Sequence, residues 1–169
     1  MPLLSSVDSE GFDDFFVGQF HMVQRSVAYV VGDRCVAEEI AQDAFVKLLQ
    51  NWAKVSRYER PDLWVRRVAL RDAQRERRRG WRRAAIESTA SSPTAIAADS
   101  QRADVLDAVA VLAPKQRAVV VLFYYEDRPM DEIASILGCS ISTGWSQLHN
   151  ARKRLGELLR EEVAGDATG

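Results

Sequence analysis

The chain has 169 residues, of which 47% are hydrophobic, so it can form one medium domain or two small ones with packed cores, and global disorder is excluded. Its two cysteines, Cys35 and Cys139, lie in no CxxC pair and have no nearby histidine, so free thiols are expected and neither zinc nor a disulfide. The apolar runs are far shorter than the roughly 18 residues of a membrane span, and the N-terminus does not resemble a signal peptide. We therefore expect a cytoplasmic protein without a membrane partner.

The net charge of −1 conceals an uneven distribution. Residues 1–59 carry five Lys or Arg against nine Asp or Glu, whereas residues 60–83 carry ten against three. Positive charge concentrated in one block is the electrostatic pattern that favours a phosphate backbone as partner.

Two amphipathic helices are predicted in the first third of the chain. The first begins near Glu10 and ends at Gly32-Asp33, because apolar residues recur in it at helical spacing. The second, over residues 36–52, has an apolar stripe that includes Phe45 and Leu48. Its opposite side carries Glu38, Glu39, Gln42 and Asp43. A solvated acidic face near a helix N-terminus explains these charges, since it suits the helix dipole; a docking face for a protein partner is the alternative.

A strongly basic helix is predicted from Pro61 onward. Its apolar part is followed by seven arginines within the fourteen residues 66–79. A merely solvated face is possible, but no nearby acidic segment neutralises this charge. Arginine matches phosphate oxygens in geometry and charge, so the helix is predicted to bind DNA through the following side chains: Arg66, Arg67, Arg71, Arg75, Arg78 and Arg79.

Residues 84–102 are rich in Ala, Ser and Thr with a central Pro and little periodicity, which predicts a flexible linker. Residues 103–112 predict a short helix. Three more helices follow: one from Pro114, one after Arg128-Pro129 that ends at Gly138, and one with Ser140 as its N-cap. Helix, short Gly-containing turn and helix is typical of a helix-turn-helix that reads DNA, although a three-helix bundle that binds nothing has the same outline.

Two stretches resemble the sigma-70 family of bacterial RNA polymerase sigma factors. Residues 37–45, AEEIAQDAF, resemble the AED..QE.F segment of region 2, and residues 131–140, DEIASILGCS, resemble the helix-turn-helix core of region 4. Pro114, Gln116 and Arg117 before that core, and Arg152 and Arg154 after it, extend the likeness. The helical region between these two in larger sigma factors is missing, so the chain resembles the extracytoplasmic-function (ECF) group.

The resemblance implies an all-α fold of two small domains, with region 2 at residues 10–83, the linker at 84–102 and region 4 at 103–160. It implies a subunit that recruits core RNA polymerase to promoters, starts transcription and then leaves. The chain would be a monomer when free, would contact the clamp helices and flap of polymerase and promoter DNA, and could be held by an anti-sigma factor. It would have no catalytic residues, no metal and no cofactor. Four residues would face the clamp helices: Glu38, Glu39, Gln42 and Asp43.

In the same family the basic helix binds the minus-ten element, and the last helix of region 4 binds the minus-thirty-five element. The resemblance therefore implies a DNA face on that last helix formed by Ser142, Thr143, Trp145, Ser146, Gln147 and Asn150, with Arg152 and Arg154 on phosphates. Gln can make paired hydrogen bonds to adenine.

This sequence departs from the family at several of these positions. Arg71 and Arg75 stand where an Asn and an Asp are usual, which leaves phosphate binding intact and puts base choice in doubt. Gly144 and Trp145 stand where a Val and a Lys are usual, and Gln147 replaces an Arg. Trp145 either covers the space left by Gly144 or reads DNA. These departures also fit a polymerase-binding adaptor without promoter choice, and a stand-alone helix-turn-helix regulator is a third function that the sequence allows.

Overall fold

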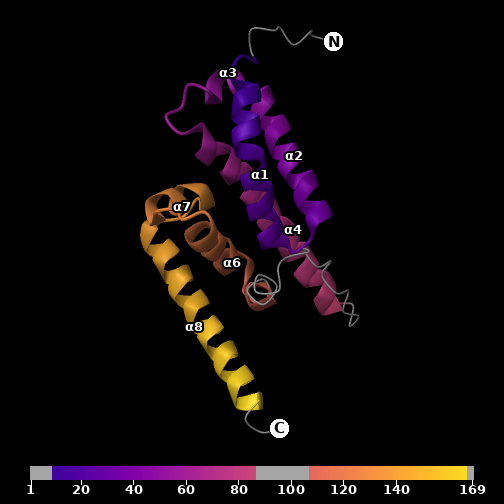
Figure 1. Ribbon diagram of the computed structural model, residues 1–169, viewed down its shortest axis with the longest axis vertical. Coiled ribbons are helices and arrows are strands. Elements are labelled where there is room, and N and C mark those ends of the chain that lie inside the picture. The colour runs from indigo at the N-terminus through magenta and orange to yellow at the C-terminus, as the bar shows by residue number, and fades with distance from the viewer. Residues whose placement is uncertain (1–8, 87–106, 167–169) are drawn as a thin grey trace.

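The structure is a computed structural model that describes residues 9–86 and 107–166 (Figure 1). Every regular element in these two ranges is helical: α1 (Phe12–Val31), α2 (Arg34–Gln50), α3 (Trp52–Val55), α4 (Pro61–Ile86), α6 (Pro114–Val120), the π-helical turn η1 (Val121–Tyr125), α7 (Met130–Leu137) and α8 (Ile141–Asp166). The expected all-α class is confirmed. Most of the predicted linker lies outside the described residues, as does the start of the helix expected at 103; residues 107–110 are helical.

The helix ends follow the capping residues of the sequence. Gly32 ends α1 in the left-handed conformation, with φ of 77°, which glycine adopts without strain. The carboxylate of Asp33 then accepts a hydrogen bond of 3.1 Å from the backbone N–H of Val36 and caps α2. The second predicted helix is divided in two, because Asn51 separates α2 from the short α3.

The first half of the chain is a bundle of α1, α2 and α4, with α3 at one end (Figure 1). Aromatic rings fill the α3 end of the bundle. The ring of Phe45 lies edge-on to those of Phe16 and Phe20, with 5.2 Å and 5.4 Å between ring centres. The ring of Trp52 lies edge-on to that of Phe12, with 5.5 Å between their centres. Such pairs add about 0.5–1.5 kcal/mol each to the burial of their surface. This packing fixes one face of α2 inward and leaves the other to solvent.

The second half is a helix-turn-helix built from α6, η1, α7 and α8 (Figure 1). Gly138 ends α7 with φ of 66°, and the hydroxyl of Ser140 accepts a hydrogen bond of 3.1 Å from the backbone N–H of Thr143. The expected stop and the expected N-cap are both confirmed. Helix α8 continues to Asp166, beyond residue 160, where region 4 was expected to end.

The space beside Gly144 is occupied by Met130, the first residue of α7. A Cβ atom placed on Gly144 would lie 2.5 Å from the Met130 sulfur, closer than side-chain atoms can approach. Met130 itself is buried. Glycine therefore lets α7 and α8 pack closely, and a methionine fills the volume that a larger side chain on α8 would take.

The two halves pack against each other in this conformation. Helices α6 and α7 lie against α4, and η1 lies against α1 (Figure 1). Buried side chains of both halves form one hydrophobic cluster, in which Val30 and Val65 of the first half join Leu122 and Ile133 of the second. The surface between the halves is therefore part of the core of the folded chain.

Candidate functional site

The outer face of α2 carries a group of acidic and polar side chains. Glu38, Glu39, Gln42 and Asp43 are all exposed, while Ala41 behind them is buried. The Gln42 amide lies 3.4 Å from a Glu38 oxygen, and within the described part of the chain none of the three carboxylates has a cation as partner. Val46 adjoins them and is 53% exposed. This face can bind basic side chains around a small apolar contact.

The exposed arginines of α4 form the predicted cationic surface. Arg67, Arg71, Arg75, Arg78 and Arg79 are all exposed. Two of them lie within 3.7 Å of carboxylates on their own helix, Arg75 near Asp72 and Arg79 near Glu76. Ion pairs this open to solvent contribute at most about 1 kcal/mol, so both arginines can exchange these carboxylates for phosphates.

Arg66 is placed differently from the other arginines of α4. Only 3% of its surface is exposed, and its Nε donates to an oxygen of Glu126 at 2.7 Å. Its Nη1 donates to Gln19 on α1 at 2.9 Å. In this conformation Arg66 is out of reach of a phosphate, and its predicted role in DNA binding would require Glu126 to leave.

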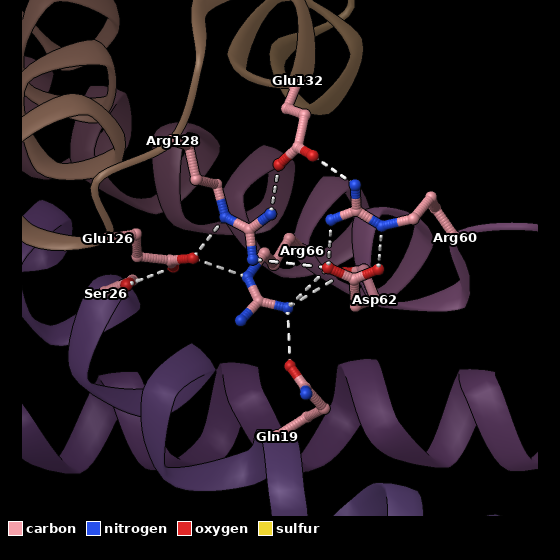
Figure 2. Close-up of polar contacts among 8 residues, drawn as sticks. All are labelled: Gln19, Ser26, Arg60, Asp62, Arg66, Glu126, Arg128 and Glu132. Atoms are coloured by element: carbon pink, nitrogen blue, oxygen red, sulfur yellow. Dashed lines mark hydrogen bonds and ion pairs between the residues drawn. The ribbon is translucent and has the colours of Figure 1, made fainter.

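Glu126 is the centre of a polar network between the two halves (Figure 2). Besides Arg66, its carboxylate accepts from the hydroxyl of Ser26 on α1 at 2.6 Å and from Nε of Arg128 at 2.6 Å. We call the eight linked side chains the interdomain network: Gln19, Ser26, Arg60, Asp62, Arg66, Glu126, Arg128 and Glu132. Three guanidinium groups and three carboxylates therefore meet with no net charge.

The outer part of the network is held by Arg60 and Arg128. Arg60 pairs with Asp62 at 3.0 Å and also with Glu132 of α7, while Arg128 pairs with Glu132 at 2.7 Å and lies 3.4 Å from Asp62. Burial raises the pKa of Asp62, but the hydrogen bond from Arg60 and the nearby arginines outweigh it and lower that pKa overall. The hydrogen bond from Arg60 likewise lowers the pKa of Glu132. Both groups are thus held as carboxylates.

A second buried arginine joins the halves through a backbone carbonyl. Arg117 of α6 is 2% exposed and donates from Nε to the backbone carbonyl of Tyr29, in the last turn of α1. Burial, helped by the charge of Arg77, lowers the pKa of Arg117 to about 10, so the side chain stays charged at neutral pH. A cation at this place complements the C-terminal end of the α1 dipole.

On α8 the predicted DNA face is divided between two environments. Ser142, Ser146 and Asn150 point to solvent, as does Arg154 beyond them. The exposed Thr143 and the half-buried Gln147 line a cavity of about 100 Å³, to which Gln74 of α4 also contributes. The two predicted DNA-binding helices are therefore neighbours here.

Trp145 and Arg152 lie on a side of α8 that contacts η1. The Trp145 ring lies 5.9 Å from that of Phe123 and is 48% exposed. Arg152 donates from Nε to the Tyr124 hydroxyl at 2.8 Å, and its guanidinium lies 5.6 Å and 5.7 Å from the Phe123 and Tyr124 ring centres. These aromatic side chains hold Arg152 in one orientation.

Several residues of this arrangement were missed in the sequence. Glu126 and Arg128 lie in the turn before α7; in the sequence Arg128 marked only the start of a helix, and no role was assigned to Glu126 or Asp62. The excess of arginine at 60–79 was interpreted as a phosphate-binding surface, and no local pattern pointed to Glu126 as a partner of Arg66. Within residues 9–86 and 107–166, we find no group of three acidic, His or Cys side chains that could hold a metal ion, and no helix long and apolar enough to cross a membrane.

Comparison with known proteins identifies both halves. Residues 20–83 match the family model of sigma-70 region 2, and residues 102–155 match that of sigma-70 region 4. The RNA polymerase sigma-E factor of Streptomyces avermitilis is 34% identical over 155 residues, covering 88% of this chain and 84% of that protein. CarQ of Myxococcus xanthus, an RNA polymerase sigma factor, is 30% identical over 158 residues, or 90% and 91% of the two chains.

A third relative carries the name of the smaller group. The ECF RNA polymerase sigma factor SigL of Mycobacterium tuberculosis is 30% identical over 140 residues, covering 78% of this chain and 79% of SigL. Among solved structures, CnrH bound to the cytosolic domain of CnrY has a TM-score of 0.68 at 19% identity, covering 92% of this chain and 94% of that one. The sigma factor RpoE of Bartonella quintana, in complex with the anti-sigma factor NepR, has a TM-score of 0.67 at 22% identity, covering 88% and 96%. These two likenesses show the shared fold.

Proposed function

Since the chain belongs to the ECF group of the sigma-70 family, whose members are RNA polymerase sigma factors for transcription initiation, we propose that the acidic face of α2 docks it on core polymerase while α4 and α8 bind promoter DNA. In this proposal residues 10–83 are region 2, residues 103–160 are region 4, and residues 84–102 are the linker. The tether makes binding of the second half to the same promoter an intramolecular event.

The uncompensated acidic face of α2 carries the polymerase-docking part of the proposal. Glu39 and Asp43 are four residues apart, so they lie on one side of the helix, and both are exposed. Complementary charge brings two proteins together in the right register, and Val46 supplies a small apolar contact beside it. We place the clamp helices of polymerase on this face, and the flap on region 4.

The DNA part of the proposal uses the exposed arginines of α4 for the minus-ten element and α8 for the minus-thirty-five element. Phosphate contacts position a protein on DNA, whereas contacts to base edges choose the sequence. The exposed Ser146 and Asn150 are suited to base edges, and Arg152 and Arg154 to phosphates. Gln147, which lines the same cavity as Gln74 of α4, joins the base-reading group when α8 separates from α4.

The family is not an enzyme class, and we propose that this chain carries out no covalent chemistry of its own. It would act in the cytoplasm, where sigma factors meet polymerase. The complexes of its structural neighbours with CnrY and with the anti-sigma factor NepR support a further partner of the anti-sigma type for this chain.

Binding to purified core polymerase tests the docking face. We expect the fluorescently labelled chain to bind, and Glu39→Lys with Asp43→Lys to weaken binding at least about tenfold, because like charges would then face the partner. The matched control is Asp13→Lys with Glu59→Lys, which changes the net charge equally at exposed positions elsewhere in the first half. Equal affinities for the two variants would contradict the assignment of the α2 face.

A further inference from the structure

The interdomain network joins two surfaces whose charges are complementary. The part from the first half, at residues 60–66, contains two guanidiniums and one carboxylate: Arg60, Arg66 and Asp62. The part from the second half contains two carboxylates and one guanidinium: Glu126, Glu132 and Arg128. Each surface alone has a net charge of one unit, and the signs are opposite. Such a match specifies which surfaces meet and how they are oriented.

The carboxylate of Glu126 accepts hydrogen bonds from both halves of the chain. Three donors from three segments reach its two oxygens: Ser26 of α1, Arg66 of α4 and Arg128 from its own turn. The Glu126 side chain is 2% exposed. Arg66 is 3% exposed, and its Nε and Nη1 donate to Glu126 and Gln19, so a DNA phosphate cannot reach this guanidinium while Glu126 is in place.

The arginine surface of α4 beside the network faces the end of α7. Arg67, Arg71 and Gln74 of α4 line a cavity of about 190 Å³ whose other wall is the end of α7, at Leu137 and Gly138. Arg67 and Arg71 are nevertheless exposed to solvent. Docking of the second half therefore buries Arg66 and places the end of α7 beside these two arginines without covering them.

We propose that residues 60–66 of region 2, together with Gln19 and Ser26 of α1, form a docking surface for region 4 of the same chain. On this surface Glu126 binds the guanidinium of Arg66 in place of a phosphate of promoter DNA. The free chain is then closed, and DNA binding competes with region 4 for region 2. The competition with DNA rests on the proposed function of α4; the docking surface itself does not. Because the linker keeps region 4 at a high effective concentration, even modest contacts are enough to close the chain.

The cysteines of the full-length chain report on opening. Cys139 lies at the turn between α7 and α8, is half-buried and lines the same cavity as Gln74 of α4, whereas Cys35 on α2 is exposed. Opening uncovers Cys139 and leaves Cys35 unchanged. The rate at which a maleimide reagent modifies Cys139, divided by that for Cys35, thus measures the open fraction within one sample.

Glu126→Gln is the test variant, because it removes the charge and keeps the shape. Asp131→Asn is its matched control: it removes one negative charge at an exposed position of α7 outside the network. Glu132→Gln, at the outer part of the network, is a second and milder variant. Far-UV circular dichroism verifies that each variant keeps its helices, and a variant that has lost them is replaced by the milder one.

We expect Glu126→Gln to raise the Cys139 to Cys35 ratio several-fold, Glu132→Gln to raise it less, and Asp131→Asn to leave it unchanged. If the open form is about a tenth of the wild-type population, full opening strengthens apparent DNA affinity about tenfold. The DNA probe is a random duplex of 25 base pairs at low salt, since phosphate contacts do not depend on sequence. Adding Arg66→Gln to Glu126→Gln should remove much of the gain in DNA affinity and leave Cys139 reactive.

The outcomes separate the two claims. An unchanged cysteine ratio in both network variants, with helices intact, would overturn the docking surface. A raised ratio with no gain in DNA affinity over Asp131→Asn would support the docking surface and overturn the competition, and with it the DNA role proposed for Arg66. A raised ratio with a gain that Arg66→Gln reverses would support both.

Discussion

Nε of Arg66 on α4 lies 2.7 Å from a carboxylate oxygen of Glu126, sixty positions further along the chain, and both side chains are almost completely buried. This ion pair connects the half of the molecule that carries the polymerase-docking face with the half that carries the helix-turn-helix. It takes an arginine from the block with the highest positive charge in the sequence and neutralises it inside the fold. Substituting one of these two residues and substituting both are expected to change the stability of the chain by different amounts.

Replacing only one partner of this pair should destabilise the chain more than replacing both. Arg66→Met removes one of the two guanidiniums that bind Glu126 and leaves Arg128 in place, so its cost should stay below the roughly 3–5 kcal/mol of a buried charge left with no partner. In the double variant with Glu126→Met no such charge remains at this position. We expect the free energies of unfolding in urea to show a coupling of about 0.5–3 kcal/mol between the two sites. Additive effects would mean that the two side chains do not interact in solution.

The carboxylates of the network predict a loss of stability in acid. The pKa values of Asp62 and Glu132 in the folded chain lie below their ordinary values of 3.8 and 4.5. Their contribution is therefore complete above these values and is lost as the pH falls through the lower, folded pKa values. We expect the urea concentration at the midpoint of unfolding to decrease as the pH is lowered below about 4.5. The fall should be smaller for Asp62→Asn with Glu132→Gln, and an equally steep fall in that variant would contradict this origin.

Gly144 and Gly156, both on α8, should respond oppositely to alanine. At Gly156 an added Cβ meets nothing within 4 Å, so Gly156→Ala should stabilise the chain by up to about 1 kcal/mol through helix propensity. At Gly144 the Cβ would lie 2.5 Å from the Met130 sulfur, so Gly144→Ala should destabilise it by roughly 1–3 kcal/mol through overpacking. Thermal unfolding measures both.

The same contact predicts a rescue. Met130→Ala removes the sulfur that blocks Gly144, so Gly144→Val should be tolerated better in that background than alone. The double variant would place the larger side chain on α8, as is usual in the family, and the smaller one on α7. Failure of Met130→Ala to reduce the cost of Gly144→Val would show that another neighbour limits this position.

Tyr124 should influence DNA binding only through Arg152. Its hydroxyl accepts the Nε–H of Arg152 at 2.8 Å, which leaves the two Nη groups for a phosphate. We expect Tyr124→Phe to weaken binding to a duplex about two- to tenfold, equivalent to the net value of one hydrogen bond. In an Arg152→Ala background the same substitution should have no further effect. Additive losses would mean that Tyr124 contacts DNA itself or supports the fold more generally.

The parts of the molecule that depend on local chemistry could be predicted from the sequence. Glycine at position 138 and serine at position 140 fix the turn of the helix-turn-helix because one accepts a positive φ and the other caps an N-terminus. The alternation of apolar and acidic residues on α2 placed Glu39 and Asp43 outside. In each case the residues that determine the structure are within a few positions of one another.

The contacts between the halves could not be predicted in this way. Arg66 looked like its neighbours in the sequence, and only the packing of α4 against α1 and α7 and its ion pair with Glu126 make it a buried residue. Met130 looked like an ordinary first residue of a helix, yet its side chain fills the space that a Cβ atom at position 144 of α8 would need. Both contacts arise from packing between elements, for which a single sequence has no periodic signal.

Run-off transcription with purified core polymerase and a library of promoter fragments tests the central claim most directly. The account predicts transcripts with defined start sites that require this chain and that disappear with Glu39→Lys plus Asp43→Lys but persist with Asp13→Lys plus Glu59→Lys. Polymerase binding without any start-site-specific transcript would contradict it and would favour an adaptor.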